Sequence, residues 1–112
     1  MLLEMNTTVV KVEKTPYDLV PKAHLEGSEN KLSIDFHAGL ITFCEGDAVD
    51  VKIFFYEMPE TNDNSYIMSG VLYETAIEGI KVSFGGLILE LTGKIPDDLE
   101  MGCKVFIILS KI

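Results

Sequence analysis

A Gly-Gly pair flanked by two runs of alternating apolar and polar residues constrains the fold of this chain more than any other feature. In residues 80–84 the repeating apolar set falls on even numbers, and in residues 87–91 it falls on odd numbers. A two-residue hairpin loop requires this change of parity if both strands are to face the same core. Gly85 and Gly86 suit such a loop, because a type I′ turn needs positive φ at both central residues. A bulge that bends one long strand around a barrel is the alternative, and both interpretations indicate β structure.

The hairpin interpretation fixes the register between the two runs. Three apolar pairs then share one face, namely Ile80 with Leu91, Val82 with Leu89, and Phe84 with Leu87. On the other face Lys81 lies opposite Glu90, which is a favourable pair of opposite charges. The sequence therefore predicts an antiparallel pair of strands between residues 80 and 91.

Alternation with period two recurs along the rest of the chain, with turn signals between the runs. The predicted strands cover residues 8–13, 19–26, 31–36, 49–55, 66–75, 80–84, 87–91 and 104–109. Val10 and Val12 are the expected core positions of the first strand, and Ala23 and Leu25 those of the second. About eight short strands at this spacing are typical of all-β sandwiches and barrels.

Three segments depart from simple alternation. The run 104–109 is apolar at successive positions, which predicts a strand buried on both faces. Residues 58–65 are polar and have no apolar period, so we expect a loop. Residues 96–100 begin with proline and two aspartates, which favour the start of a helical turn that Gly102 would end.

The length of 112 residues predicts a single domain, residues 1–112, with one core. A hydrophobic fraction of 47% excludes disorder throughout the chain. The longest apolar run, residues 105–109, is far too short to cross a bilayer, and residues 1–5 do not resemble a targeting segment. We therefore expect an intracellular protein that does not bind membranes.

The charge balance argues against nucleic acid as a partner of the isolated chain. All nine basic residues are lysines, and 18 carboxylates bring the net charge to -9. An acidic surface repels phosphate, whereas affinity for nucleic acid rests largely on the neutralisation of phosphates by lysine and arginine. Arginine, the preferred residue for bidentate contacts to phosphate or guanine, is absent from the sequence.

The residue types that carry catalysis or bind metals are sparse and widely spaced. Cys44 and Cys103 form no C-x-x-C pair, and with His24 and His37 they lack the paired spacing of structural zinc ligands. We expect buried free thiols and solvated histidines. The acidic loops lack the spacing of a calcium-binding loop, and no nucleophile motif is present. The sequence therefore predicts no catalytic residue, no metal and no cofactor.

Phe54 and Tyr56 are the aromatic residues that most suggest a function. In the strand 49–55, Phe54 occupies the face opposite the core, and Tyr56 and the outward Ile88 add to the exposed apolar surface. Base stacking on such aromatics would need a basic groove, and only Lys52 and Lys81 are near. We expect instead a surface that another protein covers.

The segment Ser83-Phe84-Gly85-Gly86-Leu87, followed by Leu91 and Gly93, resembles the signature of one protein family. This family is the small eighth subunit shared by the eukaryotic nuclear RNA polymerases, which has a counterpart among the small subunits of archaeal RNA polymerase. The strands 31–35 and 66–73 are similar to the family's Lys-Leu-x-Leu-Asp strand and to its strand before the Gly-Gly segment. The resemblance spans nearly the whole chain, and its most specific part is the Phe-Gly-Gly segment.

The resemblance implies an eight-stranded antiparallel barrel of oligonucleotide-binding-fold type. It also implies a non-catalytic structural subunit of DNA-directed RNA polymerase that docks on the largest subunit and neighbouring core subunits during transcription. Its place would be the nucleus, or the cytoplasm if the source is archaeal. Two features differ from the family: the loop 58–65 is much shorter, and the chain closes on Ser110-Lys111-Ile112 where relatives end in two arginines. Lys111 is then the candidate for an end-anchoring contact.

We expect the docking surface to include Phe84, Gly85 and Gly86, together with Phe54 and Tyr56. A turn without side chains lets another backbone approach closely, and surface aromatics make good interface anchors. Two other classes remain open at this stage. One is a free module of oligonucleotide-binding-fold type that binds single-stranded nucleic acid, and the other is a small-ligand barrel or an esterase-like enzyme, which would need a cavity with converging polar groups.

Overall fold

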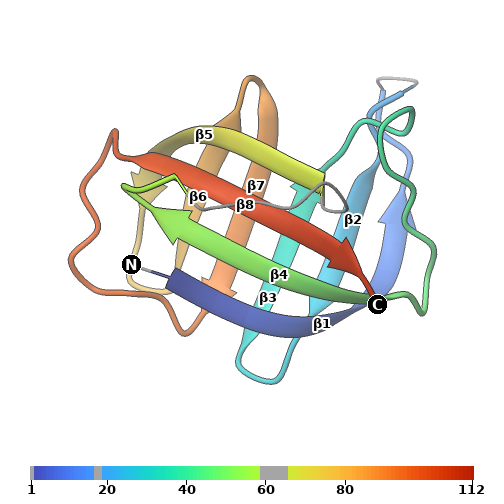
Figure 1. The fold of residues 1–112 in the computed structure, drawn as a ribbon, viewed down its shortest axis with the longest axis horizontal. Coiled ribbons are helices and arrows are strands. Elements are labelled where there is room, and N and C mark those ends of the chain that lie inside the picture. Colours follow the sequence, from blue (N-terminus) through green and yellow to red (C-terminus); the bar gives the residue numbers. More distant parts are fainter. Residues whose placement is uncertain (1, 17–18, 59–65) are drawn as a thin grey trace.

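The computed structural model describes residues 2–16, 19–58 and 66–112, and this part of the chain is all β, with no helix. Eight strands form a closed barrel in the order β1-β2-β3-β7-β6-β5-β8-β4, and every neighbouring pair is antiparallel (Figure 1). The strands are β1 (Leu2–Glu13), β2 (Lys22–Glu26), β3 (Asn30–Asp35), β4 (Ala48–Phe55), β5 (Tyr66–Thr75), β6 (Gly79–Phe84), β7 (Leu87–Gly93) and β8 (Lys104–Lys111). The predicted all-β antiparallel barrel is confirmed.

Side chains that alternate along each strand fill the barrel from inside. In β3, Leu32 and Ile34 are buried, whereas Lys31 is exposed. In β4 every second residue from Val49 to Phe55 has no exposed surface. This is the arrangement in which one face of each strand packs on a common core and the other faces water. One cluster of buried apolar side chains occupies the interior.

The strand β8 is buried on both faces, as its unbroken apolar sequence predicts. Val105, Ile107 and Leu109 point into the core. Phe106 and Ile108, on the outer face, are only 9% and 8% exposed. The absence of alternation in this run is therefore the signal of two-sided burial.

The β6–β7 hairpin has the predicted register. Ile80 pairs with Leu91, Val82 with Leu89, Phe84 with Leu87, and Lys81 with Glu90. The Nζ atom of Lys81 lies 3.9 Å from a carboxylate oxygen of Glu90 and 3.4 Å from one of Glu74 on β5. The alternative of a bulge at the two glycines is therefore wrong.

The first strand differs from its prediction in both its start and its inward face. β1 begins at Leu2 rather than at residue 8, and Val9 is buried where Val10 is 45% exposed. The cause is a bulge, because the register with β2 shifts between Val9 and Lys11. Thr7 concealed the earlier half of the strand, since it is a polar residue that is buried and whose hydroxyl donates to the carbonyl of Val49 at 2.9 Å.

Two further predictions need correction. β2 starts at Lys22 rather than at residue 19, and Leu19 is 59% exposed; Pro21 lacks the N–H that a ladder needs. Residues 96–100 contain no helical turn. Backbone groups of this segment are instead bonded across to Tyr56 at the end of β4. Most of the predicted loop 58–65, residues 59–65, lies outside the described residues.

Asn30 joins the start of β3 to the end of β7 and is buried, with 7% of its surface exposed. Its side-chain amide donates to the carbonyl of Thr92 at 3.2 Å and to that of Lys94 at 2.8 Å. These bonds satisfy carbonyl groups where the ladder between β3 and β7 ends.

We expect Asn30→Ala to lower the free energy of unfolding by about 1–3 kcal/mol, because two carbonyls lose their donor in a buried place. Urea unfolding followed by circular dichroism measures this change. Ser28→Ala, an exposed neighbour on the same turn, is the matched control and should change stability by less than about 0.5 kcal/mol. Equal effects of the two substitutions would show that the amide does not stabilise this junction.

Candidate protein-docking site

The turn of the β6–β7 hairpin projects from the barrel as bare backbone. Gly85 and Gly86 have φ of +65° and +102°, the left-handed values that favour glycine. A Cβ atom built on either glycine would meet nothing within 4 Å, and both residues are exposed. The N–H of Gly86 donates to the hydroxyl of Ser83 at 3.2 Å, which closes the turn. The turn is therefore a rigid segment that another backbone can approach without meeting a side chain.

Phe84 anchors this turn from the inside. Its ring is 6% exposed and belongs to the core, packed over Gly70 of β5. A Cβ on Gly70 would lie 2.2 Å from the carbonyl oxygen of Ser83 and 2.7 Å from Cδ1 of Phe84. Only glycine at position 70 lets β6 approach β5 so closely. Phe84 is thus a support for the turn rather than a surface contact.

Asp35 holds the other arm of the hairpin. Its Oδ2 atom accepts a hydrogen bond from the N–H of Ile88 at 3.1 Å, near the start of β7. Its Oδ1 atom lies 3.6 Å from Nζ of Lys22, and both side chains are largely covered. The carboxylate therefore ties β3 and β2 to the segment that follows the two glycines.

Phe54 lies on the outer face of β4, as predicted, and is half-buried. Its partners in register are Leu2 on β1 and Phe106 on β8. Ile108 and Ile67 form the next outward apolar pair, between β8 and β5. Sequence reasoning did not assign these neighbours to the Phe54 surface, although the unbroken apolar run of β8 was the signal that both faces of that strand are apolar.

Tyr56 is 43% exposed, but its hydroxyl is already engaged. It donates to the carbonyl of Asp98 at 3.4 Å and accepts the N–H of Glu100 at 3.0 Å. Its φ of +75° is a conformation that residues other than glycine rarely adopt. Tyr56 therefore fastens the segment between β7 and β8 across one end of the barrel, a structural role that the sequence did not indicate.

The same end of the barrel holds one of the two cysteines. Burial raises the pKa of the Cys103 thiol, and a hydrogen bond with Tyr56 offsets part of that rise. Cys103 is half-buried, whereas Cys44 is exposed in the turn before β4, so the expectation of two buried thiols is wrong for Cys44. Both cysteines are free.

Lys111 is bound within the chain. Its Nζ atom donates to the carbonyl of Thr42 at 2.8 Å and lies 3.3 Å from Oδ2 of Asp47. The same Asp47 oxygen accepts the N–H of Cys44 at 2.8 Å. The pKa of the Asp47 carboxyl is lowered first by that N–H and then by Lys111. Lys111 thus holds the turn before β4, at the end of β8 that lies far from Phe54.

The predicted docking residues do not form one cluster. In the strand order, β8 and β5 separate the Phe54 surface on β4 from the hairpin that begins on β6 (Figure 1). Lys111 pairs with Val49 at the start of β4, whereas Phe54 and Tyr56 lie at its end. The hairpin turn, with its supports Asp35 and Gly70, is the most sharply built of these features and is the candidate site.

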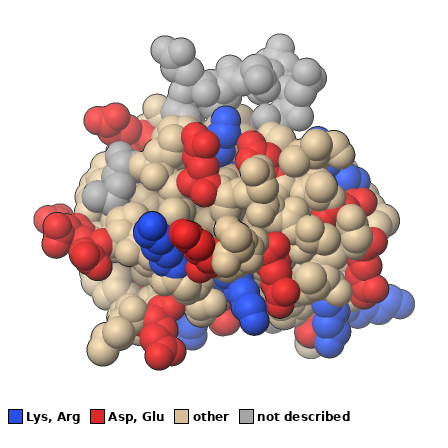
Figure 2. Space-filling model, turned by 90° about the horizontal axis from the view of Figure 1, so that it is seen from below, with Lys and Arg blue, Asp and Glu red and all other residues tan. Residues whose placement is uncertain are grey.

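The lysines of the barrel are dispersed among carboxylates. Six of the nine have a carboxylate oxygen 3.7 Å or less from Nζ: Lys11, Lys22, Lys31, Lys81, Lys94 and Lys111. On the face drawn in Figure 2, lysine and acidic side chains alternate. Binding of a polyanion would have to displace these carboxylates and overcome a net charge of -9.

Histidines and cysteines do not converge. The Nδ1 atom of His37 accepts the N–H of Gly39 at 3.1 Å, and His24 lies 3.1 Å from a carboxylate oxygen of Glu13. Among the residues that the structure describes, no group of three or more His, Cys, Asp or Glu side chains is placed to hold a metal ion. In the same part of the chain no helix is long and apolar enough to span a membrane.

Comparison with known proteins gives no further constraint: no family model matches the chain, and no curated protein matches it.

We expect Gly70→Ala to lower the free energy of unfolding by about 3 kcal/mol, because the added methyl group overlaps the backbone of Ser83. Chemical denaturation measures the loss, and Ser69→Ala, at an exposed neighbouring position, is the matched control. A Gly70→Ala protein as stable as the control would contradict the close packing of β5 against β6.

The Asp47 turn predicts a pH dependence with a definite sign. Because folding lowers the pKa of Asp47 below its ordinary value of 3.8, the carboxylate stabilises the fold above that pH. This contribution is lost as the pH falls through the lower, folded pKa. In urea unfolding over a pH series, the difference between wild type and Asp47→Asn should shrink below pH 3.8. Asp97→Asn controls for the loss of one exposed negative charge; a difference that stays constant to about pH 2 would refute this role.

Proposed function

We propose that this chain is a non-catalytic structural subunit of a DNA-directed RNA polymerase, docked on the largest subunit through the β6–β7 hairpin. One observation carries the proposal: the three segments that resemble the polymerase subunit family meet at that hairpin. They are residues 31–35, 66–73 and 83–87, which are far apart in the sequence. Asp35 binds the backbone of Ile88, and Gly70 accommodates Phe84. Their resemblance therefore concerns one place in the structure.

The barrel architecture is compatible with this assignment. Eight antiparallel strands close around a filled apolar core, and we infer a relation to the oligonucleotide-binding fold from the resemblance. The inward positions are bulky and apolar, as in small barrels whose interior has no room for a ligand. This favours a scaffold that presents its outer surface to a partner over a barrel that holds a small molecule.

Within the proposed interface the residues have different roles. Gly85 and Gly86 are exposed and would contact the partner directly. Phe84, inside the core, fixes the direction of the turn. Phe54 supplies a half-exposed aromatic surface beyond two intervening strands of the barrel, so a large partner would have to cover both places.

A charge-bearing side chain placed in the turn tests the docking. We expect Gly86→Arg to abolish co-purification with the largest polymerase subunit, because a long cationic side chain would stand between the two backbones. Gly46→Arg is the matched control, since Gly46 also has positive φ, at +92°, and open space around a Cβ. Both substitutions carry the same kind of backbone strain and the same added charge, and circular dichroism confirms that each variant folds.

Retention of Gly86→Arg in the polymerase at the yield of Gly46→Arg would contradict docking through the hairpin. The remaining class, a free single-strand-binding module, is separated by fluorescence anisotropy of a labelled oligonucleotide at low salt. We expect no binding, since the lysines have carboxylate neighbours and the chain is acidic. Binding that weakens with salt would favour that class over the polymerase subunit.

A further inference from the structure

The first half of β1 has a strand on one side only. β1 pairs with β4 over Leu2–Thr8 and with β2 over Thr8–Glu13. On the β2 side of residues 2–7, no strand of the described chain is paired. The barrel is closed through the second half of β1, and its first half leaves an edge of backbone groups exposed.

The direction of the backbone groups on this edge follows from the pairing with β4. The N–H of Val9 donates to Asp47, and its carbonyl accepts from Gly46, so both groups of Val9 point toward the β4 side. Backbone groups of successive strand residues alternate between the two sides. The N–H and C=O of Glu4 and the N–H of Asn6 therefore point to the open side. In agreement, the carbonyl oxygen of Asn6 lies only 3.1 Å from where a Cβ of Gly27, in the β2–β3 turn, would be.

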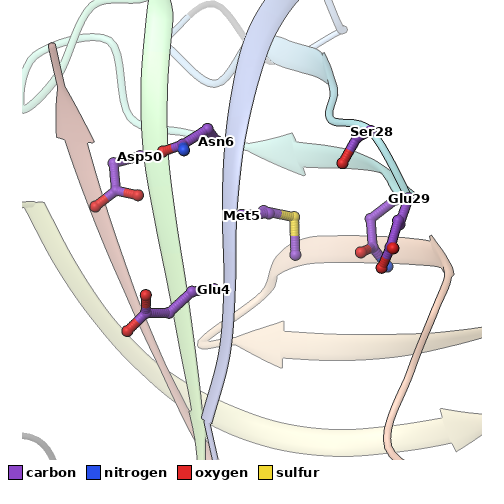
Figure 3. Close-up of a pocket in the computed structure, with 7 residues that line it drawn as sticks. Glu4, Met5, Asn6, Ser28, Glu29 and Asp50 are labelled. Carbon is purple, nitrogen blue, oxygen red and sulfur yellow. The ribbon is translucent and has the colours of Figure 1, made fainter.

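A hollow of about 430 Å³ accompanies the open edge. Its lining is Glu4, Met5, Asn6, Ser28, Glu29, Asn30 and Asp50. Figure 3 shows Met5 pointing from β1 toward the β2–β3 turn that carries Ser28 and Glu29, with Glu4 and Asp50 on the other side of β1. Met5 is 9% exposed and supplies an apolar floor. The wall is fixed, because both amide hydrogen bonds of Asn30 go to the backbone at the end of β7 and just after it.

The charges around the edge are mostly negative. Glu4 and Asp50 stand on the outer side of the strand, and Glu29 stands on the turn across the hollow. Lys52 is opposite Glu4 in register, and Lys94 lies 3.7 Å from Glu29 with both side chains more than half exposed. An exposed ion pair of this kind contributes little, so an incoming cation can replace Lys94. With a net charge of -9 on the chain, the complementary ligand is cationic.

We propose that this edge of β1 accepts an extended, lysine- or arginine-bearing peptide segment, which adds a strand beside residues 2–6. The peptide backbone bonds to the free groups of Glu4 and Asn6, one face of the peptide packs on Met5, and its basic side chains reach Glu4, Asp50 and Glu29. Addition of a strand to an exposed sheet edge obtains affinity from main-chain bonds and specificity from alternate side chains. The inference depends on the pairing of β1 and stands whether or not the chain belongs to a polymerase.

The test uses a fluorescent ten-residue peptide of alternating lysine and valine, with neutral ends, titrated into the full chain. We expect binding tighter than about 1 mM and slower amide hydrogen exchange at Glu4 and Asn6, by about tenfold. A peptide with glutamate in place of lysine, and one N-methylated at every second residue, should each bind at least about tenfold more weakly. The first peptide tests charge and the second tests backbone bonding.

Two substitutions at one position separate the same contributions on the protein side. Glu4→Ala removes a carboxylate and keeps the N–H, whereas Glu4→Pro also removes the N–H that points to the open side and leaves the β4 ladder intact. We expect binding about twofold to threefold weaker for Glu4→Ala and at least about tenfold weaker for Glu4→Pro. If Glu4→Pro does not fold, the N-methylated peptide decides. The absence of any binding, equal binding of the N-methylated peptide, or unchanged exchange at Glu4 and Asn6 would overturn the proposal.

Discussion

The contact between the ring of Phe84 and the bare backbone of Gly70 is the constraint on which the rest of this barrel depends. It lets β6 approach β5 so closely that a methyl group would overlap the Ser83 carbonyl. Since β6 and β7 are joined by a two-residue turn, the position of Phe84 also sets that of Leu87 and of the strand that pairs with β3. A local hairpin is thereby connected to both halves of the closed sheet.

The backbone of the hairpin turn is exposed because its side-chain contacts all lie on the inside. Phe84 packs in the core, Ser83 closes the loop, and Asp35 binds the N–H of Ile88. Two glycines at positive φ then remain at the surface with nothing near them. Surface that is rigid, uncharged and free of side chains costs little to bury against a partner, since few rotamers are lost. This is the physical basis for treating the turn as a docking element.

The sequence predicted those parts of the fold that depend on alternation, and failed where polar residues are buried or backbone groups bind side chains. The register of the β6–β7 hairpin followed from parity alone. The start of β1 did not, because Thr7 is buried with its hydroxyl bonded and a bulge moves the pattern from Val9 to Val10. The candidate site was found by motif, but its supports at Asp35 and Gly70 required three dimensions. The hydrogen bonds of Tyr56 and Lys111 to distant segments had no signal in the local sequence.

Hydrogen exchange of the chain alone and bound to the purified largest polymerase subunit tests the central claim most directly. The account predicts slower exchange in the complex at the amides of residues 85–88, where the turn would meet the partner. Exchange at these amides that is the same in the free and bound chain, with protection elsewhere, would contradict docking through the hairpin.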